Sequence, residues 1–204
     1  MARYSAEHKA ATRARILAAS ERLLKRDGVE GASVEAVMHE AGLTVGGFYA
    51  HFESKDDLAR AALLYSVEHS FAKLMRQLEG LDDRRFVEAL ITRYLEQADD
   101  PNLEDACPLT ILLPEVARSP ADFREAFAAR TGALLRKVEQ RFPAQRGLSQ
   151  RETALAVFAA LSGAVTMARA AATPKARARI ADATRVFLFD ALGVNQRRNS
   201  KPRR

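Results

Sequence analysis

The chain has 204 residues, 48% of them hydrophobic, and a single cysteine, Cys107. This length and composition suit a globular protein with a buried core, and one cysteine excludes an internal disulfide framework and favours a reducing cytoplasm. The sequence has no run of 18 apolar residues, so we predict no membrane span. The polar, basic N-terminus MARYSAEHKAATRAR lacks the apolar segment of a secretory signal.

The net charge of +6 is unevenly distributed along the chain. Residues 193–204 hold five basic residues and no acidic one, and we predict that this tail is disordered and auxiliary. Residues 1–26 hold seven basic and two acidic residues, whereas residues 27–60 hold two basic and seven acidic ones. The net charge is therefore weak evidence for nucleic-acid binding, although a basic first helix can meet phosphates.

Two helices are predicted at the N-terminus. Apolar residues recur at helical spacing over residues 7–26, and Asp27-Gly28 is a turn signal that predicts the end of this helix. A second helix is expected over residues 33–40. Ser33 is a suitable N-cap there, because its hydroxyl can accept a hydrogen bond from an unpaired amide of the first turn.

A glycine-rich segment, Gly42–Phe52, follows the second helix. Gly42 predicts a tight turn, because glycine adopts positive φ without a Cβ clash. Thr44 is the expected N-cap of a third helix over residues 45–52. Two short helices joined by a glycine-containing turn predict a helix-turn-helix.

Six further helices are predicted from the same apolar periodicity. Their expected ranges are 54–79, 83–97, 107–117, 121–142, 149–172 and 173–192. The helix over 107–117 should be short or bent, because two prolines interrupt it. The sequence shows no strand pattern and no internal repeat, so we predict an all-α fold of about nine helices, which begins with a three-helix helix-turn-helix domain.

The glycine-rich segment has the residue types that a DNA-reading helix needs. Small residues, Thr44, Gly46 and Gly47, allow a close approach to the major groove, and Phe48 and Phe52 are expected to anchor the helix in a core. The alternative interpretation is a glycine-rich loop followed by core aromatics. The position of the segment after two capped helices favours DNA binding.

The stretch from Ser33 to Leu58 resembles the N-terminal domain of tetracycline-repressor-like (TetR) regulators. The resemblance covers residues 9–60 closely and the rest of the chain loosely. It is carried by Ser33-Val34, Val37, Ala41-Gly42-Leu43-Thr44, Gly46-Gly47-Phe48-Tyr49, His51-Phe52, Ser54-Lys55 and Leu58. In this family the domain reads operator DNA as a homodimer, and a C-terminal helical domain binds a small inducer.

The resemblance implies a set of DNA contacts. They are Ser33, Thr44, Val45, Gly46, Gly47, Tyr49, His51 and Lys55. Many relatives carry polar or basic side chains at the base-facing positions, whereas Val45, Gly47 and Ala50 offer no side-chain hydrogen bonds. Base readout should therefore rest on thymine methyl contacts, on Thr44 and Tyr49, and on DNA shape.

The resemblance also implies a ligand-binding and dimerisation domain over residues 54–192, after a DNA-binding domain over residues 1–53. The candidate ligand-lining residues are Tyr65, His69, Phe86, Tyr94, Cys107, Leu112, Phe123, Phe127 and Met167. Core packing is the alternative for each, and His69 is expected to be a hydrogen-bonded core histidine. Four scattered histidines and one cysteine predict no metal site, and we expect no cofactor.

Cys107 allows two interpretations. The segment from Cys107 to Thr110 resembles a motif of one branch of the family, in which the thiol of some members responds to electrophiles or oxidants. A cysteine at a helix N-terminus gains thiolate character and reactivity. The alternative is a small buried hydrophobe.

The last two helices are expected to form a dimer surface. Their apolar stripes comprise Leu155, Phe158, Leu161, Val165, Ile180, Ala183 and Phe187. Two such helices from each subunit would form a four-helix bundle, although both stripes could also be internal core. A two-fold dimer predicts a palindromic operator.

The sequence thus predicts a cytoplasmic, ligand-responsive transcriptional regulator, most simply a repressor that a small molecule or an electrophile releases from its operator. It is not expected to be an enzyme, because no acid–base pair, nucleophile–base pair or phosphate loop occurs at a telling spacing. One alternative is an all-helical small-molecule-binding protein or redox sensor with weak or non-specific DNA binding. Another is a non-specific nucleic-acid binder that uses the basic tail.

Overall fold

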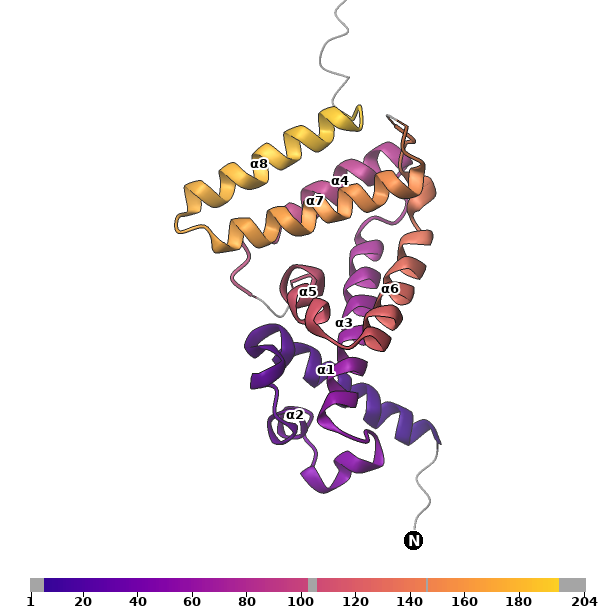
Figure 1. Ribbon diagram of the computed structural model, residues 1–204, viewed down its shortest axis with the longest axis vertical. Helices are drawn as coiled ribbons and strands as arrows, with labels where there is room; N and C mark the ends of the chain where they lie inside the picture. The colour runs from indigo at the N-terminus through magenta and orange to yellow at the C-terminus, as the bar shows by residue number, and fades with distance from the viewer. Residues whose placement is uncertain (1–5, 103–105, 146, 195–204) are drawn as a thin grey trace, which may run out of the picture. The chain divides into compact units, whose positions relative to one another are not determined.

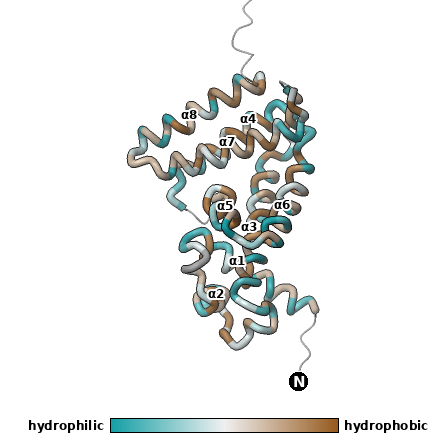
Figure 2. The backbone as a smooth tube through the Cα atoms, in the orientation of Figure 1, coloured by the Kyte–Doolittle hydropathy of each residue, from teal (hydrophilic) through white to brown (hydrophobic). Residues whose placement is uncertain are grey.

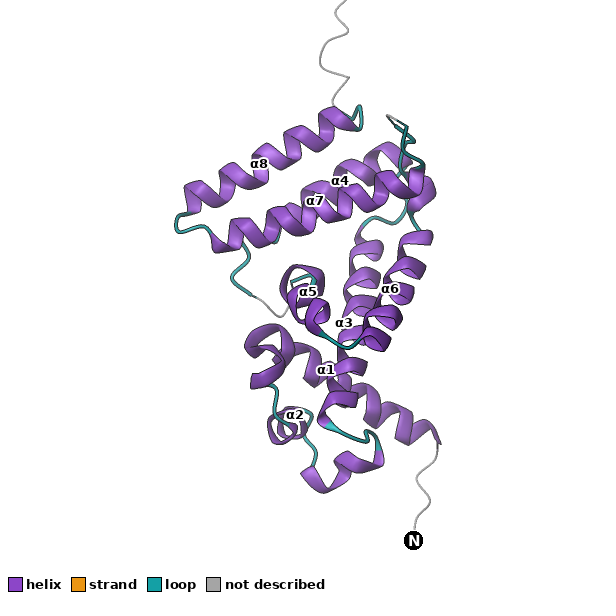
Figure 3. Cartoon of the chain, in the orientation of Figure 1, coloured by secondary structure: helices purple, strands orange, loops and turns teal. Residues whose placement is uncertain are grey.

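A computed structural model describes residues 6–102, 106–145 and 147–194 of the chain. In these ranges it contains eight α-helices and two short 3-10 helices, η1 and η3 (Figure 3). The predicted all-α class is therefore confirmed. The predicted disordered tail begins at residue 193, and its residues 195–204 lie outside the described part of the chain.

The chain forms two compact units, each built from two stretches of sequence. Unit 1 comprises Met1–Ser70 and Asn102–Arg130, and unit 2 comprises Phe71–Pro101 and Thr131–Arg204. Two helices, α3 (Lys55–Gln77) and α6 (Ala121–Arg136), each contribute residues to both units. The predicted boundary after residue 53 divides a DNA-binding domain from a ligand-binding domain by function, and it does not coincide with the boundary of a compact unit. This division by function stays a prediction.

Helices α1 (Ala6–Gly31) and α2 (Val34–Glu40) open unit 1. The turn signal at Asp27-Gly28 is confirmed, because the helical backbone of α1 breaks at Gly28. Gly28 has φ 74°, and the helix resumes for a short stretch beyond it. The expected cap of α2 is confirmed, because the hydroxyl oxygen of Ser33 accepts a hydrogen bond from the amide of Ala36 at 3.1 Å.

The third helix differs from its predicted form. The α-helix expected over residues 45–52 is a 3-10 helix, η1 (Val45–Ala50), and Thr44 makes no side-chain capping hydrogen bond. Gly46 and Gly47 explain the difference, since each glycine is about 0.8–1.0 kcal/mol less favourable in an α-helix than alanine. Six residues in 3-10 form suit a short connecting helix.

Helix α5 (Pro108–Arg118) contains Pro114 and is short, as predicted. The helix expected over residues 121–142 instead ends at Arg136, and a separate 3-10 helix, η3 (Glu139–Arg141), follows. The proline at position 143 accounts for the end of η3 but not for the end of α6 at Arg136. It favours an extended residue before it, and Phe142 has ψ 143°.

Three long helices, α4 (Asp83–Glu96), α7 (Gln150–Ala170) and α8 (Pro174–Ala191), form most of unit 2. Helix α7 packs against both α4 and α8 (Figure 1). Ser149 starts α7 with a complete capping box, and Thr173 caps α8 ahead of its first-turn proline. These two caps stabilise the helix starts where the sequence places them.

Helix α7 is long and apolar enough to cross a membrane by length and composition alone (Figure 2). However, 44% of the residues in its most apolar window are buried inside the protein. Ala154, Leu161 and Val165 have no exposed surface. Burial against neighbouring helices therefore explains the apolar residues on one face of α7.

Candidate nucleic-acid interface

One face of η1 is anchored in the core of unit 1. Phe48 and Phe52 are 1% and 2% exposed, and their rings stack with centroids 5.9 Å apart. Ile16, Val37 and Leu58 are buried too, which confirms the predicted core positions. Two buried aromatic rings hold this short helix at a defined height and rotation.

The opposite face of η1 is exposed. Val45 is 43% exposed and Tyr49 is 77% exposed, and the ring of Tyr49 meets Phe48 edge-on at 5.1 Å. A Cβ added at Gly46 would meet no atom within 4 Å. The surface between the two large side chains is therefore shallow, and a partner can approach the backbone closely there.

The turn before η1 is tied to α1. Arg15 donates from Nη2 to the carbonyl oxygen of Ala41 at 2.8 Å, and Arg22 forms an ion pair with Glu40 at 2.8 Å. Gly42 has φ 67°, as its position in a tight turn predicts, and a Cβ there would lie 3.3 Å from Arg15 Nη2. These contacts hold the end of α2 and the start of the turn against α1.

Two of the predicted DNA contacts lie at the starts of other helices. The Ser33 hydroxyl oxygen is used as the cap of α2, and Lys55 is the first residue of α3. Ser54 caps α3, because its Oγ accepts a hydrogen bond from the amide of Asp57 at 3.0 Å. Of the rest, Thr44, Val45, Gly46 and Tyr49 are exposed at η1. Their roles as DNA contacts stay predictions.

His51 follows η1 and lies in a positive electrostatic environment. Its Nδ1 is buried and has no hydrogen-bond partner among the described residues. Burial lowers the pKa of His51 below the ordinary value of 6.5, and the nearby Lys9, Arg13 and His8 lower it further. The guanidinium of Arg13 lies 4.6 Å from the centre of the Phe52 ring. Sequence reasoning missed this grouping, because its members are far apart in the chain.

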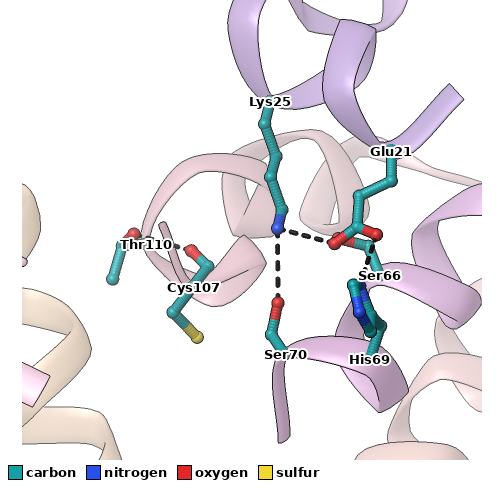
Figure 4. Close-up of polar contacts among 7 residues, drawn as sticks. All are labelled: Glu21, Lys25, Ser66, His69, Ser70, Cys107 and Thr110. Carbon is teal, nitrogen blue, oxygen red and sulfur yellow. Dashed lines mark hydrogen bonds and ion pairs between the residues drawn. The ribbon is translucent and has the colours of Figure 1, made fainter. Parts of the chain in front are cut away.

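A buried polar network links α1 to α3 within unit 1 (Figure 4). Glu21 and Lys25 are 5% and 3% exposed, and Lys25 Nζ lies 2.6 Å from Glu21 Oε1. Ser66 donates to Glu21 Oε1 at 3.1 Å, and His69 Nδ1 lies 2.8 Å from Glu21 Oε2. Lys25 also donates to Ser70 at 3.3 Å.

His69 forms the predicted hydrogen bond. The expectation that it lies in the core is wrong, because its side chain is 50% exposed. Sequence reasoning also missed the other members of this network. The only local signal was the i, i+4 spacing of Glu21 and Lys25. Because this spacing is equally common on solvated helix faces, it could not indicate burial.

The predicted ligand-lining residues fall in both units. Unit 1 holds Tyr65, His69, Cys107, Leu112, Phe123 and Phe127, and unit 2 holds Phe86, Tyr94 and Met167. Most of the aromatic members are buried, whereas Met167 is 64% exposed. An open groove between α4 and α8 contains none of these residues. It is lined by Leu81, Arg85, Glu88, Ala89, Thr92, Arg93, Glu96 and Phe189. The lining of a ligand cavity therefore stays a prediction.

The part of the chain that the structure describes holds no group of three His, Cys, Asp or Glu side chains placed to bind a metal ion. A histidine that lies beside a carboxylate serves another contact. His69, for example, bonds the Glu21 carboxylate that also pairs with Lys25.

The residues expected at a dimer surface divide into two groups. Leu155 and Phe187 are 51% and 65% exposed, so they are available to a partner. Leu161 and Val165 have no exposed surface, because they face the core of unit 2. These two residues are core residues and have no surface left to bury in an interface.

Comparison with known proteins gives the helix-turn-helix a family. Residues 16–62 match the family described as bacterial regulatory proteins, tetR family. The transcriptional regulator UidR of Escherichia coli K12 is 33% identical over 70 residues, which are 34% of this chain and 36% of UidR. The nicotine-responsive repressor HdnoR of Paenarthrobacter nicotinovorans is 29% identical over 75 residues, which are 37% of this chain and 39% of HdnoR. The chain thus spans little more than a third of the length of these curated relatives.

The likeness of fold extends further along the chain. The crystal structure of a TetR transcriptional regulator from Chloroflexus aurantiacus superposes with a TM-score of 0.69 at 24% identity. The superposition covers 91% of this chain and 98% of that protein. Residues 16–62 therefore carry the DNA-binding domain of the tetR family of bacterial regulatory proteins, and the chain as a whole has the helical fold of a solved TetR regulator.

Proposed function

We propose that the protein is a ligand-responsive transcriptional repressor that binds a palindromic operator as a homodimer. The observation that carries this proposal is the exposure of Val45 and Tyr49 on a helix whose other face is fixed by Phe48 and Phe52. Family members are regulatory proteins, which agrees with the expectation that the chain is not an enzyme. Such a regulator acts in the bacterial cytoplasm, where the DNA is.

The exposed face of η1 supports a particular way of reading DNA. The open surface at Gly46 allows the backbone to approach the floor of the major groove. Val45 then contacts thymine methyl groups, because an apolar side chain cannot read base edges by hydrogen bonding. Tyr49 and Lys55 donate to phosphate oxygens, which position the helix without reading sequence.

Selection of bound sequences from random DNA, followed by affinity measurement at fixed salt, tests this assignment. Tyr49→Ala and Lys55→Ala should each weaken binding to all sequences by about 1–2 kcal/mol, which is about 5–30-fold. Leu148→Ala, which truncates a side chain of unit 2 that is 43% exposed, is the control and should bind as the wild type does. Unchanged affinity in both Tyr49→Ala and Lys55→Ala would exclude η1 as the reading helix.

The exposed apolar residues of α7 and α8 support a homodimer. Leu155, Met167, Val186 and Phe187 are each more than half exposed, although all four are large and apolar. Several such side chains on two adjacent helices mark a protein interface. A two-fold dimer that pairs these helices would present two copies of η1 to related half-sites, which implies a palindromic operator.

The inducer is proposed to be a small molecule or an electrophile. HdnoR is by name a nicotine-responsive repressor, which shows that a relative of similar sequence answers a small molecule. In this chain the half-buried Cys107 is the N-cap residue of α5, and its carbonyl oxygen accepts hydrogen bonds from Thr110 Oγ1 at 2.7 Å and from the Thr110 amide at 3.0 Å. The amides of a helix start favour the thiolate form, which adds to electrophiles.

Operator release after treatment with a quinone or a maleimide tests the role of Cys107. Wild type should release operator, and Cys107→Ser should retain it, because a serine hydroxyl does not add to these reagents. Equal release from both proteins would remove Cys107 from the mechanism and leave a reversibly bound small molecule as the inducer.

Helix α3 is the proposed link between inducer and operator. It starts at Lys55, directly after η1, and the Glu21 network ties it to α1. An inducer that prefers one position of α3 would therefore shift the DNA-binding residues. A coupling of about 1–3 kcal/mol between the two sites is sufficient for a useful response.

A further inference from the structure

The end of α8 is fixed against the first turn of α4 within unit 2. Gly193 has φ 68°, and a residue in this conformation turns the chain away from the helix axis. The amide of Val194 donates to the carbonyl oxygen of Phe189 at 3.0 Å, and the carbonyl oxygen of Val194 accepts a hydrogen bond from Arg84 Nη2. Val194 is also buried, at 7% exposure. The last described residue is therefore held at the start of α4.

The open groove between α4 and α8, which we call the α4–α8 groove, adjoins this point. Phe189 lines it on α8, and its lining on α4 recurs along one face from Arg85 to Glu96. The two helices run in opposite directions, because the end of α8 meets the start of α4, whereas Arg177 in the first turn of α8 lies 3.4 Å from Asp99 beyond the end of α4. The groove has a volume of about 560 Å³ and extends along α4 from the last described residue.

The charged side chains of the groove differ in their contacts. Arg85 Nε lies 3.6 Å from Asp82 Oδ2, and Arg93 donates from Nη1 to Gln77 Oε1 at 3.1 Å, so both arginines already contact polar groups. Glu96 is exposed and forms no ion pair within the described ranges. A basic partner would therefore meet an uncompensated carboxylate at the far end of α4.

The segment that follows Val194 has the charge and the length to cover this groove. Residues 195–204 hold five basic residues and no acidic one, whereas residues 82–100 hold six acidic and three basic ones. Ten extended residues span at most about 33–36 Å, and the 14 residues of α4 span about 21 Å. The carbon stems of lysine and arginine cover apolar surface such as Ala89 and Phe189, while their charged ends reach carboxylates.

We propose that residues 195–204, the C-terminal segment, bind in the α4–α8 groove of their own subunit. Because Val194 is fixed at one end of the groove, the segment is present there at a high effective concentration, and weak ion pairs are sufficient to hold it. A polar segment without apolar periodicity builds no core of its own, so its order has to come from a surface on which it docks. DNA and the groove of a second subunit are the alternative partners in the test.

The test locates the C-terminal segment in the full-length protein by nuclear magnetic resonance. Ser200→Cys in a Cys107→Ser background gives a single cysteine for a nitroxide label, which broadens the amide signals of nearby residues. The same sample with the nitroxide reduced is the reference. Glu96→Lys tests the groove, and Glu125→Lys, which changes an exposed glutamate of α6 in unit 1, is the matched control. Thermal unfolding followed by circular dichroism confirms that each variant is folded.

The amide signals of residues 85–96 and of Phe189 should lose intensity while the nitroxide is oxidised. Glu96→Lys should restore intensity, because it places a cation against a basic segment, whereas Glu125→Lys should leave the loss as it is. Sodium chloride at 1 M, where the Debye length is about 3 Å, should also restore intensity, since the ion pairs are exposed.

A salt series of DNA affinity separates the groove from DNA as the partner of the C-terminal segment. The double variant Arg197→Gln, Arg198→Gln should keep the wild-type slope of log K against log salt on random DNA, because these arginines bind the groove. A slope smaller in magnitude by about 2 would assign the segment to DNA and overturn the inference.

Two resonance results would overturn it as well. Intensity lost equally over residues 85–96 and over the exposed face of α8 at Val186 and Phe187 would indicate a segment without a docking site. Broadening in isotope-labelled subunits that carry no nitroxide, mixed with unlabelled subunits that do, would place the segment in the groove of a second subunit. None of these results bears on the proposed function, which the selection of bound DNA sequences tests separately.

Discussion

Replacing Lys25 by methionine removes the cation of the buried ion pair that Lys25 forms with Glu21 on α1. The Lys25 Nζ to Glu21 Oε1 distance is 2.6 Å, and neither residue is more than 5% exposed. Methionine fills a similar volume, so the main effect is to leave a buried carboxylate without its cation. Losing one partner of a buried ion pair lowers the free energy of unfolding by about 3–5 kcal/mol. We expect the lower end, about 3 kcal/mol, because Ser66 and His69 still bond the carboxylate.

Urea unfolding at pH 7, followed by far-ultraviolet circular dichroism, measures this loss. For a chain of this length the same loss corresponds to a decrease in Tm of about 6–12 °C. The double variant Glu21→Gln, Lys25→Met should recover part of the loss, because it no longer buries an unpaired charge. That recovery separates the effect of charge from the effect of altered packing.

The matched control is Arg22→Met, on the same helix. Arg22 and Glu40 also form an ion pair, at 2.8 Å, but their side chains are 39% and 38% exposed. An exposed pair of this kind contributes about 0–1 kcal/mol. Equal losses in Arg22→Met and Lys25→Met would refute the reasoning, because burial would then not determine the strength of the effect.

Three further predictions concern the turn, the histidine beside η1 and the dimer. Gly42→Ala should lower the free energy of unfolding by about 1–2 kcal/mol, because alanine is strained at φ 67°. Gly46→Ala should change the free energy of unfolding by less than about 0.5 kcal/mol, because a Cβ there meets no atom. Urea unfolding of both variants measures the difference. The pKa of His51 is lowered in the folded protein, so as pH falls through 6.5 the His51 side chain binds a proton in the unfolded chain before it does so in the folded one. The free energy of unfolding should therefore decrease as pH falls, until the pKa of His51 in the folded protein is passed. His51→Gln should flatten this dependence in urea titrations between pH 5 and about 8, and an unchanged profile would contradict the assignment. Phe187→Glu should sediment as a monomer in analytical ultracentrifugation, and a persistent dimer would exclude this face of α8.

Local sequence signals were accurate for part of the structure that depends on neighbouring residues. Ser33 caps the helix that it was expected to cap, because a capping hydrogen bond spans only three residues, whereas Thr44, the other expected cap, makes no side-chain capping hydrogen bond. Phe48 and Phe52, which were expected to anchor the glycine-rich segment in a core, are buried. The prediction of an α-helix over residues 45–52 was wrong, because two glycines weaken an α-helix there and η1 is a 3-10 helix.

The amino-acid sequence by itself determined the all-helical class and the likeness of residues 16–62 to the tetR family, and it predicted the DNA-reading segment. Each depends on periodicity, caps and a motif within a short stretch of chain. Only the tertiary structure decided which charged side chains are buried and which groups each of them contacts. In the sequence, Glu21 and Lys25 cannot be distinguished from a solvated ion pair, but in the structure they are buried and Ser66 of α3 bonds Glu21. Arg13 and Arg15 are likewise similar in sequence, but Arg13 lies over the ring of Phe52 and Arg15 donates to the carbonyl oxygen of Ala41. The physical reason is that burial and electrostatic environment depend on contacts between residues far apart in the chain, which local spacing does not record.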